Sequence, residues 1–237
     1  MNFKEETIKL GIDYDSVMDL KFNTFYEELI RVNEYMNLTA ITERDEVYCK
    51  HFLDSLTILK AINNKNDNIK LLDVGSGAGF PAIPLAITTN NLDITIIDAL
   101  GKRIKFLNEL IDKLELTNVK ALHKRAEEYA NEMRESYDIT TARAVARLPM
   151  LCELCLPLTK VGGCFIAMKA QSASLELEEA KKAIDILGGK LENVLELKLP
   201  NDIGTRAIII IRKVKSTPAK YPRAFAKIKE KPLWNLN

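Results

Sequence analysis

A glycine-rich turn after an apolar strand pattern constrains the fold of this chain more than any other feature. Residues 71–74 are apolar apart from one aspartate, and Gly75, Gly77 and Gly79 follow at alternate positions. Glycine lets the backbone turn through positive φ and approach a ligand that a side chain would exclude. Phe80 stands where the dinucleotide-binding fingerprint needs a small residue, so nicotinamide binding is the weaker interpretation. Steric demands of a tight turn alone could also explain the glycines.

The sequence on either side of the turn favours a nucleotide-like cofactor. Asp73 precedes the glycines, where it would repel a pyrophosphate and could orient a cation such as the sulfonium of S-adenosylmethionine. Residues 81–88 predict a helix whose prolines fall in the first turn, where the amides have no intrahelical partner. A second apolar strand pattern at 93–97 ends in Asp98, about twenty residues past the glycines, the spacing at which an acidic side chain binds ribose hydroxyls.

The same alternation of strand and helix continues along the chain. We expect strands at 70–74, 93–97, 119–122, 138–142, 164–169, 190–199 and 206–214, and helices at 81–88, 102–113, 126–134, 148–158 and 174–187. Alternating β-α units predict an α/β fold with a mostly parallel, Rossmann-like, seven-stranded sheet and helices on both faces. In such a sheet a ligand binds at the carboxyl ends of the strands, where the strand order reverses.

In the sequence, helices are expected before this sheet domain and a basic tail after it. Amphipathic patterns predict helices at 15–36 and 43–62, and the polar run 63–68 separates them from the first strand. We expect one structural unit made of an N-terminal helical extension at 1–67, a cofactor-binding α/β domain at 68–215 and a basic tail at 216–237.

The charge of the chain is concentrated near its C-terminus. The formal net charge is +1, yet the stretch from Arg212 to Lys231 holds eight basic residues and one acidic residue. Such segregation is typical of a surface that binds phosphate backbones, and a solvated charged terminus explains it equally well.

Composition narrows the class of protein. We find no window of about 18 uninterrupted apolar residues and no signal-peptide pattern, so we expect a cytoplasmic protein without a membrane partner. We also expect a monomer. Four cysteines and two histidines lack the paired spacing of a zinc site, so no metal site is predicted. Cys152 and Cys155 fit reduced, buried thiols on one helix face better than a redox pair.

Two arginines follow the fourth predicted strand. Arg143 and Arg147 flank a small apolar patch at the edge where the sheet should open to its substrate. His51 and Asp54, three residues apart on one helix face, could close the pocket; a core histidine paired to an acid is the competing interpretation.

Several motifs in one order resemble the bacterial RsmG (GidB) family of 16S rRNA guanine-N7 methyltransferases. The resemblance runs nearly end to end and rests on residues 36–41, 51–56, 75–81, 97–103, 125–127 and 141–146. It implies a class I methyltransferase fold, S-adenosylmethionine as cofactor, and 16S rRNA, the small ribosomal subunit or an assembly intermediate as substrate. The tail keeps the family's Tyr-Pro-Arg and Pro-Leu but lacks the Lys, Gly and Pro usual between them.

The resemblance also implies roles for individual residues. It implies cofactor contacts at Gly75, Phe80, Ala126, Glu127 and Arg143, to which the glycine-rich turn and the ribose spacing add Gly77 and Asp98. Guanine N7 has a free lone pair, so no general base is needed, and Arg147 and His51 would only position the substrate. RNA contacts are expected at Arg147, Arg223, Lys227 and Lys229. A small-molecule methyltransferase and a non-catalytic S-adenosylmethionine-binding protein remain the alternatives.

Overall fold

The computed structural model describes residues 1–62, 68–143, 145–169, 173–200 and 204–234. Two parts of the sequence-based predictions lie outside the described residues. They are residues 63–67 of the polar run that precedes the first strand, and Ala144 of the motif at 141–146.

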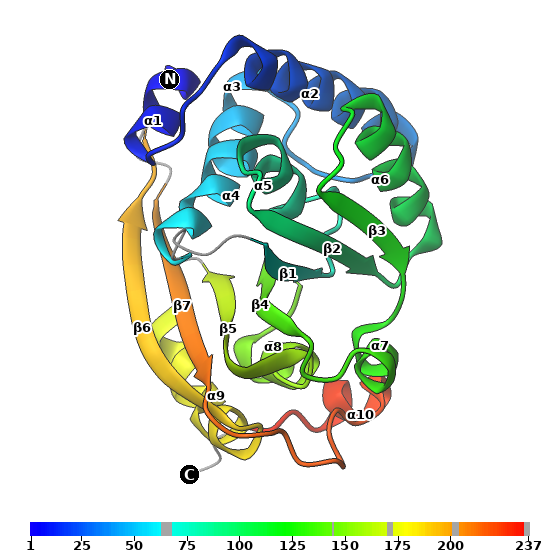
Figure 1. Ribbon diagram of the computed structural model, residues 1–237, viewed down its shortest axis with the longest axis vertical. Helices are drawn as coiled ribbons and strands as arrows, with labels where there is room; N and C mark the ends of the chain where they lie inside the picture. The colour runs from blue at the N-terminus through cyan, green and yellow to red at the C-terminus, as the bar shows by residue number, and fades with distance from the viewer. Residues whose placement is uncertain (63–67, 144, 170–172, 201–203, 235–237) are drawn as a thin grey trace.

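A seven-stranded, mostly parallel sheet forms the centre of the molecule, as predicted (Figure 1). The strand order is β3-β2-β1-β4-β5-β7-β6; the first five in the chain are parallel, and β7 runs antiparallel to both its neighbours. The order therefore reverses between β1 and β4. The strands are β1 (Ile69–Val74), β2 (Leu92–Asp98), β3 (Val119–His123), β4 (Tyr137–Arg143), β5 (Thr159–Lys169), β6 (Gly189–Lys198) and β7 (Thr205–Lys213).

Successive residues of the strands face opposite layers, because side chains alternate along a strand. Leu71 and Ile94 belong to one buried cluster, whereas Leu72 and Ile97 belong to another. Helices α1 (Phe3–Lys9), α2 (Ser16–Met36), α5 (Ala82–Thr88) and α6 (Gly101–Lys113) contribute to the first cluster. Helices α7 (Ala126–Glu132), α8 (Leu148–Cys155), α9 (Ala173–Ile186) and α10 (Phe225–Glu230) contribute to the second. Helices therefore cover both faces.

The single helix predicted at 43–62 is wrong in its interior. It divides into α3 (Arg44–Val47), a π-helical segment (Tyr48–Leu53), α4 (Asp54–Leu56) and a 3₁₀ segment (Thr57–Lys60). Apolar periodicity does not distinguish these hydrogen-bond patterns, and π-helical turns frequently occur at functional sites. Sequence patterns also missed α1 and α10, which have only seven and six residues.

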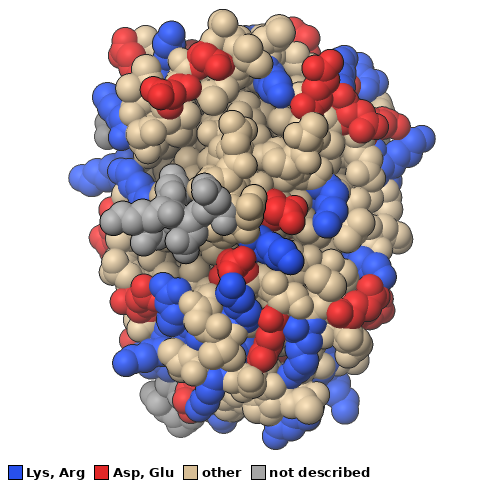
Figure 2. Space-filling view, in the orientation of Figure 1, with Lys and Arg blue, Asp and Glu red and all other residues tan. Residues whose placement is uncertain are grey.

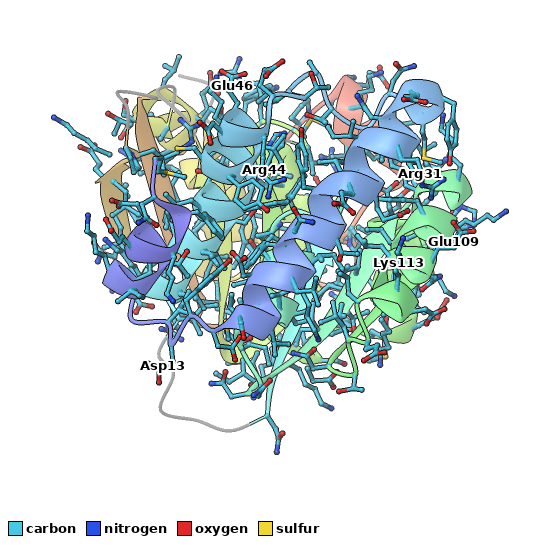
Figure 3. The ribbon with its side chains drawn as sticks, turned by 90° about the horizontal axis from the view of Figure 1, so that it is seen from above. Asp13, Arg31, Arg44, Glu46, Glu109 and Lys113 are labelled. Atoms are coloured by element: carbon cyan, nitrogen blue, oxygen red, sulfur yellow. The ribbon has the colours of Figure 1, made fainter. Side chains whose placement is uncertain are left out.

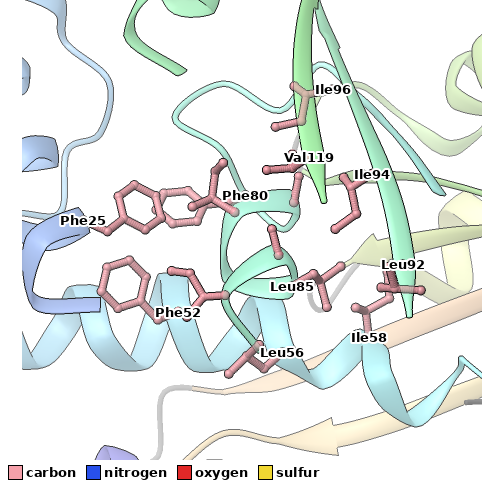
Figure 4. Packing of buried hydrophobic residues seen from close by; sticks show 14 of the residues in the cluster. Phe25, Phe52, Leu56, Ile58, Phe80, Leu85, Leu92, Ile94, Ile96 and Val119 are labelled. Atoms are coloured by element: carbon pink, nitrogen blue, oxygen red, sulfur yellow. The ribbon is translucent and has the colours of Figure 1, made fainter. Parts of the chain in front are cut away.

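Aromatic side chains join the N-terminal helices to the glycine-rich turn (Figure 4). Phe80 stacks on Phe25 of α2 with ring centroids 5.3 Å apart, and Phe25 lies 5.0 Å from Phe52 of the π-helical segment. All three rings are buried. The helical extension and the turn therefore share one core.

An acidic side chain links α2 to α6 on the surface. Glu28 forms ion pairs of 2.6 Å with both Arg31 and Lys113, which lie on adjacent helices in Figure 3. The two basic side chains are more than half exposed, so each pair adds at most about 1 kcal/mol.

The C-terminal tail is packed against the sheet domain. The guanidinium of Arg134 donates to the carbonyls of Thr217 at 2.6 Å and Tyr221 at 2.9 Å, and Tyr221 and Ile228 are buried in the second cluster. Figure 2 shows basic and acidic side chains interspersed over the lower part of the molecule, where α8, α9 and α10 lie. The described tail is therefore anchored at Thr217, Tyr221 and Ile228, whereas its lysines are exposed, so an RNA surface and a solvated charged run both stay open.

Two further features of the described residues bear on the class of protein. Within those ranges, no helix is both long and apolar enough to span a membrane. The four cysteines are free and buried, as predicted for Cys152 and Cys155.

Candidate functional site

A cavity of about 650 Å³ opens at the carboxyl ends of β1 and β2, beside the point where the strand order reverses. That volume falls in the range of about 300–1,000 Å³ typical of small-molecule sites. It brings together every residue for which a cofactor contact was predicted, and also His51: Gly75, Gly77, Phe80, Asp98, Ala126, Glu127 and Arg143 all line it. Their roles as ligand contacts stay predictions.

The glycine-rich turn requires its glycines at the positions that face this cavity. Gly75 and Gly77 have φ of 74° and 62°, in the left-handed region that side chains disfavour. A Cβ on Gly75 would come within 2.9 Å of Val145 Cγ2, whereas one on Gly77 would meet nothing within 4 Å. The turn thus leaves open space at Gly77, which a ligand can enter.

Asp98 fastens the turn to the end of β2. Its buried carboxylate accepts hydrogen bonds from the amides of Gly77 (3.2 Å) and Leu100 (2.9 Å) and from Arg103 Nη1 (3.3 Å). A carboxylate has about four acceptor positions, so capacity for one ribose hydroxyl remains.

Asp73 lies behind the turn and does not line the cavity, so the expectation that it orients a ligand directly is wrong. Its side chain is fully buried, and neither carboxylate oxygen has a hydrogen-bond partner among the described residues. Burial raises the pKa of Asp73 to about 7. When ionised, this carboxylate attracts a cation only through the backbone of the turn.

Arg143 joins the sheet to the N-terminal helices at the other end of the cavity. Its Nη1 donates to Asp54 Oδ2 at 2.8 Å and its Nη2 to His51 Nδ1 at 2.9 Å, while Arg206 Nε donates to Asp54 Oδ1 at 3.0 Å. The Arg143 Cζ also lies 5.0 Å from the centre of the Phe80 ring. These contacts place Arg143 in the wall of the cavity.

The contacts of His51 fix its protonation. An arginine can only donate, so Nδ1 of His51 must accept, and Nε2 carries the proton and donates to Thr39 Oγ1 at 2.8 Å. Burial and the charge of Arg143 lower the pKa of His51 to about 4. The competing interpretation, a core histidine paired to an acid, is wrong, because Asp54 pairs with the two arginines. His51 is neutral and has both nitrogens engaged.

A second depression of about 610 Å³ adjoins the first and shares His51, Arg143 and Val145 with it. Five basic and two acidic side chains line this depression: Lys50, Arg143, Arg147, Lys169, Arg206, Asp54 and Glu176. Lys169 and Arg206 were not predicted as site residues, because their strands β5 and β7 carry no motif that points to the site.

The residues predicted to contact RNA fall into two groups. Arg147 lines the second depression, but its Nη2 lies 2.6 Å from both carboxylate oxygens of Glu179 and its Cζ lies 5.2 Å from the Trp234 ring. Lys227 and Lys229 are exposed on α10. All three can reach a phosphate, Arg147 after leaving Glu179.

Arg223 has a different environment. Its Nε and Nη2 donate to the two oxygens of Glu153 at 2.8 and 2.6 Å, and its backbone amide donates to the same carboxylate at 2.9 Å. Glu153 is fully buried. The structure therefore assigns Arg223 to holding the tail, because releasing it for RNA would leave a buried carboxylate unpaired.

Comparisons with known proteins agree with the sequence motifs and the fold. Residues 18–207 match the family described as rRNA small subunit methyltransferase G. A protein of that name from Lactobacillus johnsonii is 47% identical over 234 residues, 98% of each chain, and one from Bacillus cytotoxicus is 53% identical over 86% of this chain and 85% of its own. A SAM-dependent methyltransferase structure from Aquifex aeolicus shares the fold, with a TM-score of 0.53 at 16% identity over 74% of this chain and 96% of that one. From the extent of the family match and these identities, the chain belongs to the GidB family of small-subunit rRNA methyltransferases.

Proposed function

We propose that this protein transfers the methyl group of S-adenosylmethionine to N7 of a guanosine in small-subunit rRNA. The observation that carries the proposal is the junction of two depressions. One contains the glycine-rich turn and suits a nucleoside cofactor, the other contains five basic side chains against two acidic ones and suits an RNA phosphate, and Arg143 and His51 belong to both.

The residues of the first cavity fit the cofactor. Gly77 leaves room for it, and Asp98 retains acceptor capacity for a ribose hydroxyl. When ionised, the buried carboxylate of Asp73 behind the turn favours a ligand that carries positive charge. When bound, S-adenosylmethionine supplies an electrophilic methyl group on a positively charged sulfur.

The chemistry of N7 suits the side chains at the junction. N7 has a free lone pair, so the protein need not remove a proton before transfer. His51, neutral and with both nitrogens engaged, is in keeping with a reaction that uses no general base. Holding N7 about 3–3.5 Å from the methyl group and in line with the sulfur can supply on the order of 7–11 kcal/mol. Positioning is then the main contribution of the protein.

Charge also decides which side chain can approach the base. Positive charge moves onto the guanine ring during transfer, so an uncompensated cation against the ring would oppose the reaction. The charge of Arg143 is offset by Asp54 at 2.8 Å. Arg147 holds a phosphate or O6, because a bidentate contact with O6 and N7 would block the target atom.

The modified nucleoside tests the proposal. Purified protein is incubated with methyl-labelled S-adenosylmethionine and with 16S rRNA or small subunits from a strain that lacks the gene, and the RNA is digested and separated by mass spectrometry. The expected product is 7-methylguanosine alone. Label in a methylated adenosine or cytidine, or no transfer to either RNA substrate, would contradict the proposal. Comparing free rRNA with the subunit also identifies the substrate.

A further inference from the structure

An aromatic residue of the C-terminal tail lines the first cavity. Phe225, the first residue of α10, borders that cavity together with Ala126 and Leu154 of the sheet domain. Its side chain is 38% exposed, whereas the nearby Tyr221 and Ile228 are buried. An exposed aromatic ring at the rim of a cavity is available to a ligand.

The fold holds this ring in place on both sides. Two residues earlier, Arg223 forms its three hydrogen bonds with the buried Glu153. Three residues later, Ile228 is fully buried in the second core cluster. The position of Phe225 is therefore fixed by the tertiary structure, and its ring can contribute to binding without first becoming ordered.

The two ends of the cavity differ in chemistry. Thr39, His51 and Arg143 supply polar groups at the end formed by the N-terminal helices. At the other end, Ile97, Ala126 and Leu154 belong to the second core cluster, and Phe225 lines the cavity with them, beside the charged residues Lys124, Arg125 and Glu127. Asp98, on the strand that carries Ile97, provides the carboxylate for a ribose.

We propose that Phe225 packs on the adenine ring of S-adenosylmethionine, so that the C-terminal tail completes the cofactor site. This inference rests on the proposed cofactor. The zwitterionic methionine part of that molecule suits the polar end of the cavity, and the flat purine suits the apolar end. An aromatic side chain packs on a purine because both present π faces. The divergent tail thus has a role in cofactor binding in addition to its charge.

Calorimetric titration with S-adenosylhomocysteine tests the inference. Phe225→Ala should weaken binding by about 5- to 150-fold, the range expected for loss of one base-aromatic contact. Phe225→Tyr keeps the ring and should stay within about twofold of the wild-type protein. Tyr35→Ala removes an aromatic side chain that is 64% exposed on α2, away from the cavity, and serves as the matched control with unchanged affinity.

Two further readouts separate the possible failures. Equal melting temperatures of the wild-type and Phe225→Ala proteins show that the fold is intact; if the melting temperature falls, Phe225→Leu provides the second comparison. Wild-type affinity for S-adenosylhomocysteine in a folded Phe225→Ala protein would overturn the inference, and a loss confined to RNA affinity would do so too by assigning Phe225 to the RNA surface. Failure of the wild-type protein to bind S-adenosylhomocysteine would instead overturn the proposed cofactor.

Discussion

Replacing Arg143 with methionine should destabilise the folded protein by about 3 kcal/mol. Removing one partner of a buried ion pair costs about 3–5 kcal/mol, because the other charge is left uncompensated. Arg143 and Asp54 have side chains only 13% and 8% exposed. Arg206 still lies 3.0 Å from Asp54 in the variant, so the expected cost is at the lower end of that range.

Urea unfolding of four proteins measures this cost. Arg143→Met should lose about 3 kcal/mol, and Arg143→Met/Asp54→Asn should recover only part of this loss, because the buried carboxylate is gone but Arg206 is left without its partner. Arg31→Met is the matched control: its guanidinium also pairs with a carboxylate, but it is 57% exposed, so the loss should stay below about 1 kcal/mol. Removal of the Arg143 charge should also raise the pKa of His51 above its value of about 4, which NMR titration detects.

Two results would refute this reasoning. One is a change below about 0.5 kcal/mol in Arg143→Met, the size of an ordinary surface substitution. The other is a double variant no more stable than Arg143→Met, which would show that Asp54 does not need its partner.

Three further predictions concern the cofactor, the RNA and the pH dependence of stability. Asp98→Ala should weaken S-adenosylhomocysteine binding about ten- to a hundredfold, because a charge-assisted hydrogen bond is lost, and should leave RNA affinity unchanged. Calorimetry with both ligands measures the two affinities, and a loss of RNA affinity alone would contradict the prediction. Arg147→Ala and Lys227→Ala should each reduce by about 0.7–0.9 the magnitude of the slope of log affinity for RNA against log salt concentration. Unchanged slopes in these two variants would exclude their phosphate contacts. Arg223→Ala should mainly lower the melting temperature. Burial raises the pKa of Asp73 to about 7 in the folded protein, so the folded state binds this proton more tightly than the unfolded chain does. The free energy of unfolding without ligand should therefore decrease as the pH rises from about 4 to about 7. Urea titrations of Asp73→Asn should show a weaker dependence of this free energy on pH, and a dependence equal to that of the wild-type protein would assign the effect to other groups.

Local sequence patterns were sufficient to predict the sheet and the grouping of several residues that line the first cavity. The glycines, Asp98 and Ala126 each follow a predicted strand, and parallel topology brings the carboxyl ends of neighbouring strands to one edge. These residues could therefore be grouped without knowing any side-chain contact.

The rest depends on contacts between residues far apart in the chain. Arg223 pairs with Glu153, 70 positions earlier, and a run of basic residues gives no sign of such a partner. Phe225 was missed because α10 is short and reaches the cavity only through tertiary packing. The tautomer of His51 likewise depends on Arg143, 92 positions later.

We propose that the junction of the two depressions methylates N7 of one guanosine in small-subunit rRNA. The most direct measurement is mass mapping of modified nucleosides in 16S rRNA from a strain that lacks this protein, complemented with either the wild-type gene or Gly77→Asp. That substitution places a side chain in the open space of the turn, at a φ of 62°. One 7-methylguanosine should be absent from the strain that lacks the protein and should return only with the wild-type gene. An unchanged pattern, or a different missing nucleoside, would contradict the proposal.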